Sequence, residues 1–202
     1  MKIYLASSNE HKKQEVLQCL QDHEIVMPID VGLDFSPKED GNSFLQNAMI
    51  KAKALYQKVK TLVLADDSGL CVKALGDRPG VFSARYSTPP MSQKNVADYG
   101  ISRLLKEMEE IEDRRAVFVC CIVLYIEEHS FFVFQDVCKG KIEYKKKGSN
   151  GFGYDPIFFV DSMAKTMAEL TEKEKNLVSH RGKALAHCRA FLKNLENLNC
   201  KI

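Results

Sequence analysis

The stretch from residue 116 to residue 138 constrains the fold of this chain most strongly. It reads AVFVCCIVLYI, then EEHS, then FFVFQDVC, so a short polar segment separates two runs rich in β-branched and aromatic residues. This pattern predicts two antiparallel strands, and the following KGKIEYK extends them into a β-meander. The chain must therefore build a sheet, and the segments on either side decide its type.

Strand and helix patterns alternate before the meander. Short apolar runs predict strands at 3–6, 24–30 and 61–65. Apolar residues recur at helical spacing after the first run, and Asn42 or Ser43 caps a longer helix over about 44–59. Two further helices are predicted, one over about 93–110 and one at the C-terminal end that carries Leu185, Cys188, Phe191, Leu192 and Leu195 inward. This order predicts an α/β fold with a mixed sheet flanked by helices.

Composition limits the class of protein. The 202 residues include 29 basic and 27 acidic side chains, a net charge of +2, so no strong global field attracts nucleic acid. No apolar run approaches the roughly 18 residues of a membrane span. The N-terminus lacks the apolar core of a signal peptide, and the seven cysteines form no CxxC pair. We expect one two-lobed domain over 1–202, located in the cytoplasm, with neither a nucleic acid nor a membrane as partner.

Two adjacent carboxylates stand out in LADDSGLCV (64–72), where Asp66 and Asp67 follow the apolar run and precede an expected Ser-Gly turn. Ligands of open α/β sheets commonly bind where strands end, and converging carboxylates suit Mg²⁺. Repulsion between the two charges also favours a bound cation or a nearby lysine. The alternative is that the pair merely begins a turn, since aspartate bonds well to its own backbone. This segment alone leaves both interpretations open.

Three polar segments are candidates for binding a nucleotide. SSNEHKK (7–13) precedes a helix whose free N–H groups favour an anion, although such residues are often only caps. GSNGFGYDP (148–156) lets backbone approach a ligand and offers an aromatic face, although a plain turn also explains its glycines. SHRGKAL (179–185) supplies donors that suit a purine carbonyl or a phosphate, although a cap and a surface cation explain them as well.

Five motifs in one order make the sequence similar to the Ham1-like family of inosine and xanthosine triphosphate pyrophosphatases. They are LASSNEHKKQEV, DGNSFLQNAMIKAKA, LADDSGLCVKALGDRPGVFSARYS, GFGYDPIF and SHRGKAL. The resemblance implies Mg²⁺-dependent hydrolysis of non-standard purine nucleoside triphosphates (ITP, dITP, XTP) to the monophosphate and pyrophosphate. It also implies an elongated mixed sheet, an active-site cleft between two lobes, and a homodimer.

The resemblance assigns roles to individual residues. Asp67 is expected to be the catalytic carboxylate and a metal ligand, with Asp66 beside it and Glu39 as a further metal ligand. Ser68 is expected to touch the substrate. The expected triphosphate-binding residues are Ser7, Ser8, Asn9, Lys12, Lys51 and Lys175. The expected base pocket consists of Phe152, Gly153, Tyr154, Asp155, His180 and Arg181.

The chain departs from the family pattern at two positions. Ser8 stands where family members often have glycine (ATGN), and Asp77 stands where GGxPG has its second glycine. Two alternatives stay open. A Maf-like nucleotide pyrophosphatase would be expected to carry an arginine pair where this chain has His11 and Lys12. A non-catalytic nucleotide-binding module would use the basic residues but gives no reason for the acidic ones.

Overall fold

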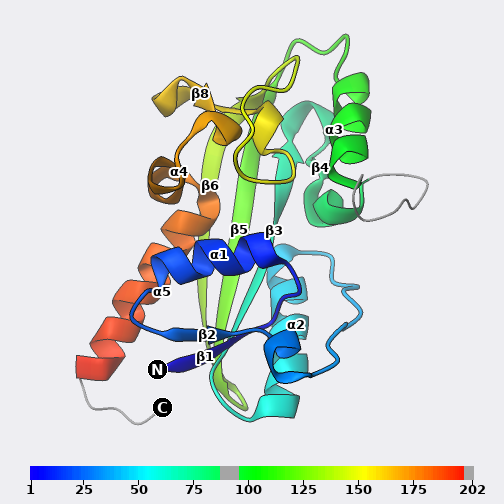
Figure 1. Cartoon of the computed structure of the whole chain (residues 1–202). Coiled ribbons are helices and arrows are strands. Elements are labelled where there is room, and N and C mark those ends of the chain that lie inside the picture. Colours follow the sequence, from blue (N-terminus) through cyan, green and yellow to red (C-terminus); the bar gives the residue numbers. More distant parts are fainter. Residues whose placement is uncertain (87–95, 198–202) are drawn as a thin grey trace. The chain divides into compact units, whose positions relative to one another are not determined.

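The structure, a computed structural model, describes residues 1–86 and 96–197 (Figure 1). Its strands are β1 (Lys2–Leu5), β2 (Glu24–Val26), β3 (Val63–Val72), β4 (Arg78–Pro79), β5 (Arg115–Glu127), β6 (Ser130–Ile142), β7 (Phe158–Val160) and β8 (Lys165–Thr166). Its α-helices are α1 (Glu10–Cys19), α2 (Phe44–Val59), α3 (Val96–Glu107), α4 (Glu172–Val178) and α5 (His180–Asn197). Short 3₁₀ helices are η1 (Pro28–Val31), η2 (Lys73–Leu75), η3 (Gly80–Arg85), η5 (Asp155–Ile157), η6 (Asp161–Met163) and η7 (Met167–Glu169).

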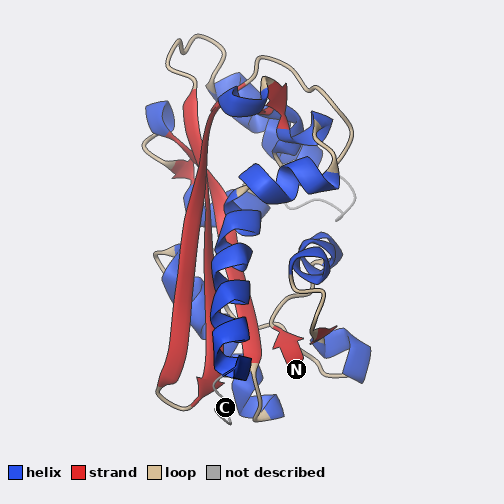
Figure 2. Cartoon of the chain, turned by 90° about the vertical axis from the view of Figure 1, so that its left-hand side faces the viewer, coloured by secondary structure: helices blue, strands red, loops and turns tan. Residues whose placement is uncertain are grey.

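The strands of the described residues form one eight-stranded sheet in the order β2-β1-β3-β5-β6-β7-β8, with β4 paired to β3. Strand β1 runs parallel to both β2 and β3, whereas the β6–β7 and β7–β8 pairs are antiparallel. Helices flank this sheet (Figure 2). The predicted mixed α/β sheet is thus confirmed, and its parallel part comes from the alternating strand and helix patterns at the start of the chain.

The chain divides into two compact units. Unit 1 comprises residues 1–67, 120–136 and 181–202, and unit 2 comprises residues 68–119 and 137–180. No helix in the described part of either unit has the length and apolar content needed to cross a bilayer.

In unit 1 the core has two layers, one on each face of the sheet. On one face, α1 and α5 pack on strand side chains that include Leu64, Cys120 and Ile122. On the other, α2 packs on strand side chains that include Val63, Ala65 and Val123. Odd and even positions of β3 therefore face different helices, as the two-residue repeat of a strand requires. This alternation continues along β3 and decides where its acidic residues point.

Unit 2 has its own core around Phe158, Leu104 and Ile101, all buried. Helix α3 contributes one side of this core, and β5, β6 and β7 supply much of the rest. The predicted helix over 93–110 is confirmed from Val96 but ends earlier, at Glu107. Its first positions, 93–95, lie outside the described residues.

Two strand predictions were wrong in their bounds. The strand expected over 24–30 ends at Val26, because Pro28 has no N–H for a ladder bond and instead begins η1. The strand expected over 61–65 is β3, which continues to Val72 and includes Ser68 and Gly69. The Ser-Gly turn therefore does not exist, and the acidic pair lies inside a strand rather than at its end.

Candidate active site

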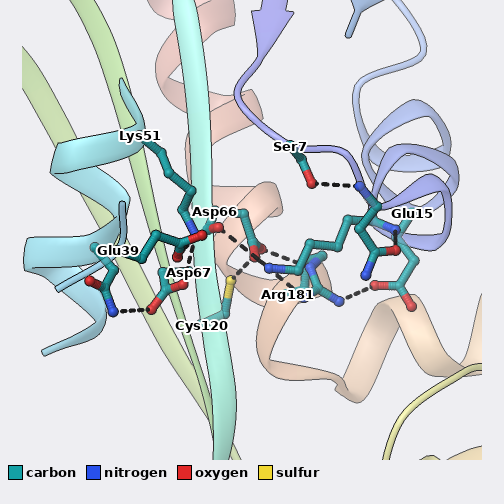
Figure 3. Close-up of polar contacts among 11 residues, drawn as sticks. Ser7, Glu15, Glu39, Lys51, Asp66, Asp67, Cys120 and Arg181 are labelled. Carbon is teal, nitrogen blue, oxygen red and sulfur yellow. Dashed lines mark hydrogen bonds and ion pairs between the residues drawn. The ribbon is translucent and has the colours of Figure 1, made fainter. Parts of the chain in front are cut away.

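Asp66 and Asp67 point to opposite faces of β3. Asp66 is two residues after Leu64, so it points to the same face, on which α1 and α5 pack. Asp67 is two residues after Ala65, so it points to the face on which α2 packs. Figure 3 shows Asp67 directed toward Lys51 and Glu39, and Asp66 directed toward Arg181 and Cys120. The expectation that both carboxylates serve one cation is wrong for this geometric reason.

On the α2 face, Lys51 joins two carboxylates. Its ammonium Nζ lies 2.7 Å from Asp67 Oδ1 and 2.7 Å from Glu39 Oε2. Asn47, one helical turn earlier on α2, donates from Nδ2 to Asp67 Oδ2 at 3.5 Å. Helix α2 presents both residues because positions i and i+4 share a face, and Ser43 begins the helix by accepting from Gln46 N–H.

Burial shapes the electrostatics of this cluster. Asp67 and Lys51 are both buried, whereas the Glu39 side chain is 30% exposed. Burial raises the pKa of Asp67, and the neighbouring Lys51 ammonium counteracts part of that effect. A carboxylate with a raised pKa is suited to accept a proton from water.

The α2-face cluster fits a magnesium ion. Mg²⁺ in nucleotide enzymes is typically held by one or two carboxylates, with waters and substrate phosphates completing the shell. Glu39 and Asp67 already converge on one cationic group, the Lys51 ammonium. Among the described residues no three His, Cys, Asp or Glu side chains gather as a metal site. Asp66 therefore does not join Glu39 and Asp67 at one cation, and the pair Glu39 and Asp67 is the candidate.

On the opposite face, Asp66 is the centre of a buried ionic network. Arg181 Nε donates to Asp66 Oδ2 at 2.8 Å, and Lys12 Nζ is bonded to Asp66 Oδ1. The Cys120 thiol donates to Oδ2 at 3.1 Å. Arg181 also pairs through Nη1 with Glu15 of α1. Burial alone would raise the pKa of Asp66, but the Arg181 and Lys12 cations outweigh it and hold that pKa well below its usual range.

The loop before α1 is organised by its own side chains. Ser7 Oγ accepts from Asn9 N–H at 3.1 Å, and Asn9 Oδ1 caps the helix by accepting from Lys12 N–H at 3.2 Å. Ser8 is exposed and is absent from the non-glycine positions of the described chain with positive φ. Its departure from glycine therefore costs no strain. Asp77, in contrast, has a φ of 62°, which lies in the left-handed region. Glycine adopts this region without strain, which explains the second glycine of the GGxPG pattern at this position.

Unit 2 holds a further buried ion pair, between Asp155 and Lys175. Lys175 Nζ lies 2.7 Å from Asp155 Oδ2 and 5.0 Å from the centroid of the Phe152 ring. Phe152 N–H donates to the same carboxylate at 2.8 Å. Gly151, with a φ of 72°, leaves no room for a Cβ, which would lie 2.1 Å from Asp155 Oδ2. Lys175 thus joins the residues expected for the base rather than the other phosphate lysines.

The remaining predicted residues are placed as follows. Tyr154 is buried in the core of unit 2, and its hydroxyl donates to the Ser83 carbonyl at 3.0 Å, which leaves Phe152 as the half-buried aromatic ring of this loop. His180 is buried and stacks on Phe118 with ring centroids 4.7 Å apart. Gly153 has a φ of 60° with open space around it. Ser68 is half-buried within β3.

Sequence reasoning missed three residues of the site: Glu15, Asn47 and Cys120. The signal for Asn47 was present, since it stands four residues before Lys51 on a predicted helix. Glu15 could have been found in the same way, since it stands three residues after Lys12 on the predicted helix and therefore shares a face with it. Cys120 shares the two-residue repeat of Ile122 and Leu124, but nothing in the sequence pairs it with Asp66.

Comparisons with known proteins find relatives that match nearly the whole chain. A dITP/XTP pyrophosphatase of Treponema denticola is 52% identical over 194 residues, which cover 96% of this chain and 99% of that protein. The structure of a HAM1 protein from Coxiella burnetii has a TM-score of 0.86 at 36% identity, and that of the Staphylococcus aureus Ham1 protein has 0.84 at 37%. Each covers 96% of this chain and 99% of the other.

The family model that matches is that of the Ham1 family, over residues 3–191. This match decides between the two enzyme families considered from the sequence, in favour of the Ham1-like one. Because the family model matches nearly the whole chain and a relative is 52% identical over 96% of it, the chain belongs to the Ham1 family.

Proposed function

We propose that this protein hydrolyses non-standard purine nucleoside triphosphates, namely ITP, dITP and XTP, to the monophosphate and pyrophosphate. The names of its relatives support a nucleoside-triphosphate pyrophosphatase. The single observation that carries the proposal is the convergence of Glu39 and Asp67 on the Lys51 ammonium, because it gathers two carboxylates and a phosphate-binding cation.

Mg²⁺ is the cofactor we propose, and Glu39 and Asp67 are the residues that would hold it. Bound there, it would neutralise charge on the phosphate oxygens. Lys12 and Lys51 bind the triphosphate and offset the negative charge that develops on the leaving pyrophosphate. Asp67 orients the attacking water and accepts its proton, for which its raised pKa is suited.

Base selection depends on the direction of hydrogen bonds. Hypoxanthine and xanthine carry a carbonyl at position 6 where adenine carries an amino group. A donor from His180 or from backbone near it would bond that carbonyl but would face another donor in ATP. A buried donor without a partner costs about 1–3 kcal/mol, so two mismatches reject ATP by a few hundredfold. Arg181 was expected to share this role, but its Nε and Nη1 donate to Asp66 and Glu15.

We further propose that the protein acts in the cytoplasm as a homodimer and forms one catalytic domain. The six cysteines in the described residues are all free thiols, which suits a reducing compartment. Phe131 and Val133 of β6 are 42% and 40% exposed, which suits a subunit interface.

Pyrophosphate release from ITP, XTP, dITP, GTP and ATP, with and without Mg²⁺, tests the proposal. We expect turnover of the first three only with Mg²⁺. Asp67→Asn should lower kcat by at least about a hundredfold while the fold persists. Asp34→Asn, an exposed carboxylate, is the control. Near-normal turnover by Asp67→Asn would contradict the assigned role. Nucleotide affinity unchanged by chelation, with no pyrophosphate released, would favour the non-catalytic binding module.

A further inference from the structure

The lone pairs of Asp66 are fully committed. An ionised carboxylate offers about four acceptor sites. Oδ2 accepts from Arg181 Nε at 2.8 Å and from Cys120 Sγ at 3.1 Å. Oδ1 accepts from Lys12 Nζ and, at 3.5 Å, from Arg181 Nη2. The side chain has no exposed surface. A metal ion or a substrate group could reach these oxygens only by displacing one of the donors.

The charges around Asp66 are balanced. Two carboxylates, Asp66 and Glu15, face two cations, Arg181 and Lys12, and all four side chains are at most 15% exposed. The group of four therefore forms a neutral, largely dry unit on the α1/α5 face. A catalytic carboxylate needs a free oxygen, whereas this one serves to balance and orient its neighbours.

Of these four residues, Lys12 is the one placed to bind the phosphates of the substrate. It lies in the first turn of α1, where the backbone N–H groups at the start of the helix favour an anion. Its ammonium is held by the Asp66 side chain and lies 3.4 Å from the Asp66 carbonyl oxygen. An ammonium has three protons, so one remains for a phosphate oxygen. The two bonds fix a side chain that has four rotatable bonds and would otherwise occupy many conformations.

We propose that Asp66 is a positioning residue for phosphate binding: it holds the Lys12 ammonium at the start of α1 and ties it, through Arg181, to the start of α5. Neighbouring aspartates of one strand then have separate tasks, with Asp67 on one face at the reacting phosphate and Asp66 on the other face behind the cation that binds the phosphate chain. This inference rests on the proposed function.

A double-mutant cycle between Lys12 and Asp66 tests it, with inorganic pyrophosphate as the probe and its Kd measured by calorimetry. The variants are Asp66→Asn, Lys12→Met and the double variant. We expect each single change to weaken pyrophosphate binding about tenfold, and the double variant to bind no more weakly than the worse single one. With ITP as substrate, Asp66→Asn should raise KM about tenfold and alter kcat less than threefold, whereas Asp67→Asn should mainly lower kcat.

The double variant also guards against misfolding. Asp66→Asn alone leaves a buried cation in excess, whereas the double variant removes one charge of each sign and keeps the Arg181–Glu15 pair. If Asp66→Asn does not fold, equal affinities of Lys12→Met and the double variant support the proposal. Arg189→Met with Asp22→Asn is the matched control, because this exposed pair joins α5 to the segment after α1 at 2.9 Å and should leave both Kd and KM unchanged.

Two results would overturn the proposal: losses that multiply in the double variant, and an Asp66→Asn enzyme that loses kcat with KM unchanged. The binding arm does not depend on turnover. If the wild type binds pyrophosphate but releases none from any nucleotide, the proposed function fails, whereas the cycle still reports whether Asp66 acts through Lys12.

Discussion

At the scale of the residue, identical side chains one position apart acquire opposite properties from their surroundings. The pKa of Asp66 is held low by Arg181 and Lys12 despite complete burial, whereas the pKa of Asp67 is raised by burial. The cause is the direction of each side chain: Asp66 pairs with both Arg181 and Lys12, whereas Asp67 pairs with Lys51, which also pairs with Glu39. Chemical role here follows from the face of the strand and not from residue type.

The Lys51 ammonium is expected to stabilise the fold when no metal is bound, and a variant that lacks it tests this. Lys51→Met leaves Asp67 buried without its cation, so we expect the free energy of unfolding to fall by about 3 kcal/mol. Mg²⁺ should stabilise the variant more than the wild type, because the metal no longer competes with an ammonium for Glu39 and Asp67. Urea denaturation with and without millimolar Mg²⁺ measures both effects.

Lys53→Met, an exposed position of the same helix, is the control and should change neither quantity. A Lys51→Met protein as stable as the wild type without metal would contradict the pairing.

Gly151 lets backbone pass directly over Asp155. In Gly151→Ala the new Cβ would displace the carboxylate that holds Lys175, so we expect a loss of about 1–3 kcal/mol beyond the cost of positive φ, together with weaker ITP binding. Gly76→Ala isolates the backbone cost, because Gly76 has a φ of 63° and open space around it. Thermal denaturation and KM for ITP compare the two variants; equal losses of stability would mean that Asp155 moves aside freely.

At the scale of the element, helix α4 owes its start to a capping box. Thr171 Oγ1 accepts from Glu174 N–H, and Glu174 Oε2 accepts from Thr171 N–H at 2.8 Å. Thr171 and Glu174 have the three-residue spacing that is typical of this motif. It matters for the site because Lys175 follows in the same turn.

The capping box predicts a pH dependence. The hydrogen bond from Thr171 N–H lowers the pKa of Glu174 below the ordinary value of about 4.3, so the stabilisation is complete above that pH and is lost as the pH falls through the lower pKa of the folded state. Glu174→Gln should therefore lower Tm at pH 7 and lessen its decline toward pH 3. Glu172→Gln removes a charge from the same turn but keeps the box, so it should decline like the wild type; a Glu174→Gln profile parallel to the wild type would refute the linkage.

Most elements were predictable because local chemistry dictates them, and the errors have identifiable causes. Helix α2 follows from its cap and its apolar spacing, and β5 and β6 follow from their β-branched and aromatic residues. Strand β3 was cut short because Asp-Asp-Ser-Gly resembles a turn. In the folded protein, Lys51, Lys12 and Arg181 neutralise the two carboxylates, which lets the strand continue. Such partners are distant in sequence, so no local pattern could indicate them.

At the scale of the whole molecule, the site residues come together from separate stretches of the chain. Glu39, Lys51 and Asp67 meet only because α2 packs on the face of the sheet to which Asp67 points. Motif order identified these residues but not their pairing. The Asp155–Lys175 pair shows the same limit, since sequence resemblance assigned the two residues to different parts of the substrate.

The proposed homodimer predicts a sensitive surface on β6. Phe131 and Val133 lie on the face opposite Phe132, whose ring packs on Phe191 of α5. Phe131→Asp with Val133→Asp should yield a monomer by size-exclusion chromatography with light scattering, because two desolvated charges oppose association. Ile29→Asp, at another exposed apolar residue, should keep the dimer. A wild type that is monomeric at micromolar concentration would refute the interface.

Asp66 and Asp67 make ion pairs on opposite faces of β3, so the register of this strand decides which partners each aspartate meets. A single residue inserted between Leu64 and Asp66 would turn each aspartate to the opposite face, so that Asp66 would point toward α2 and Lys51, and Asp67 would point toward α5 and Arg181. A one-residue change of length at this place would therefore disrupt both sets of ion pairs, although the chain would keep both aspartates.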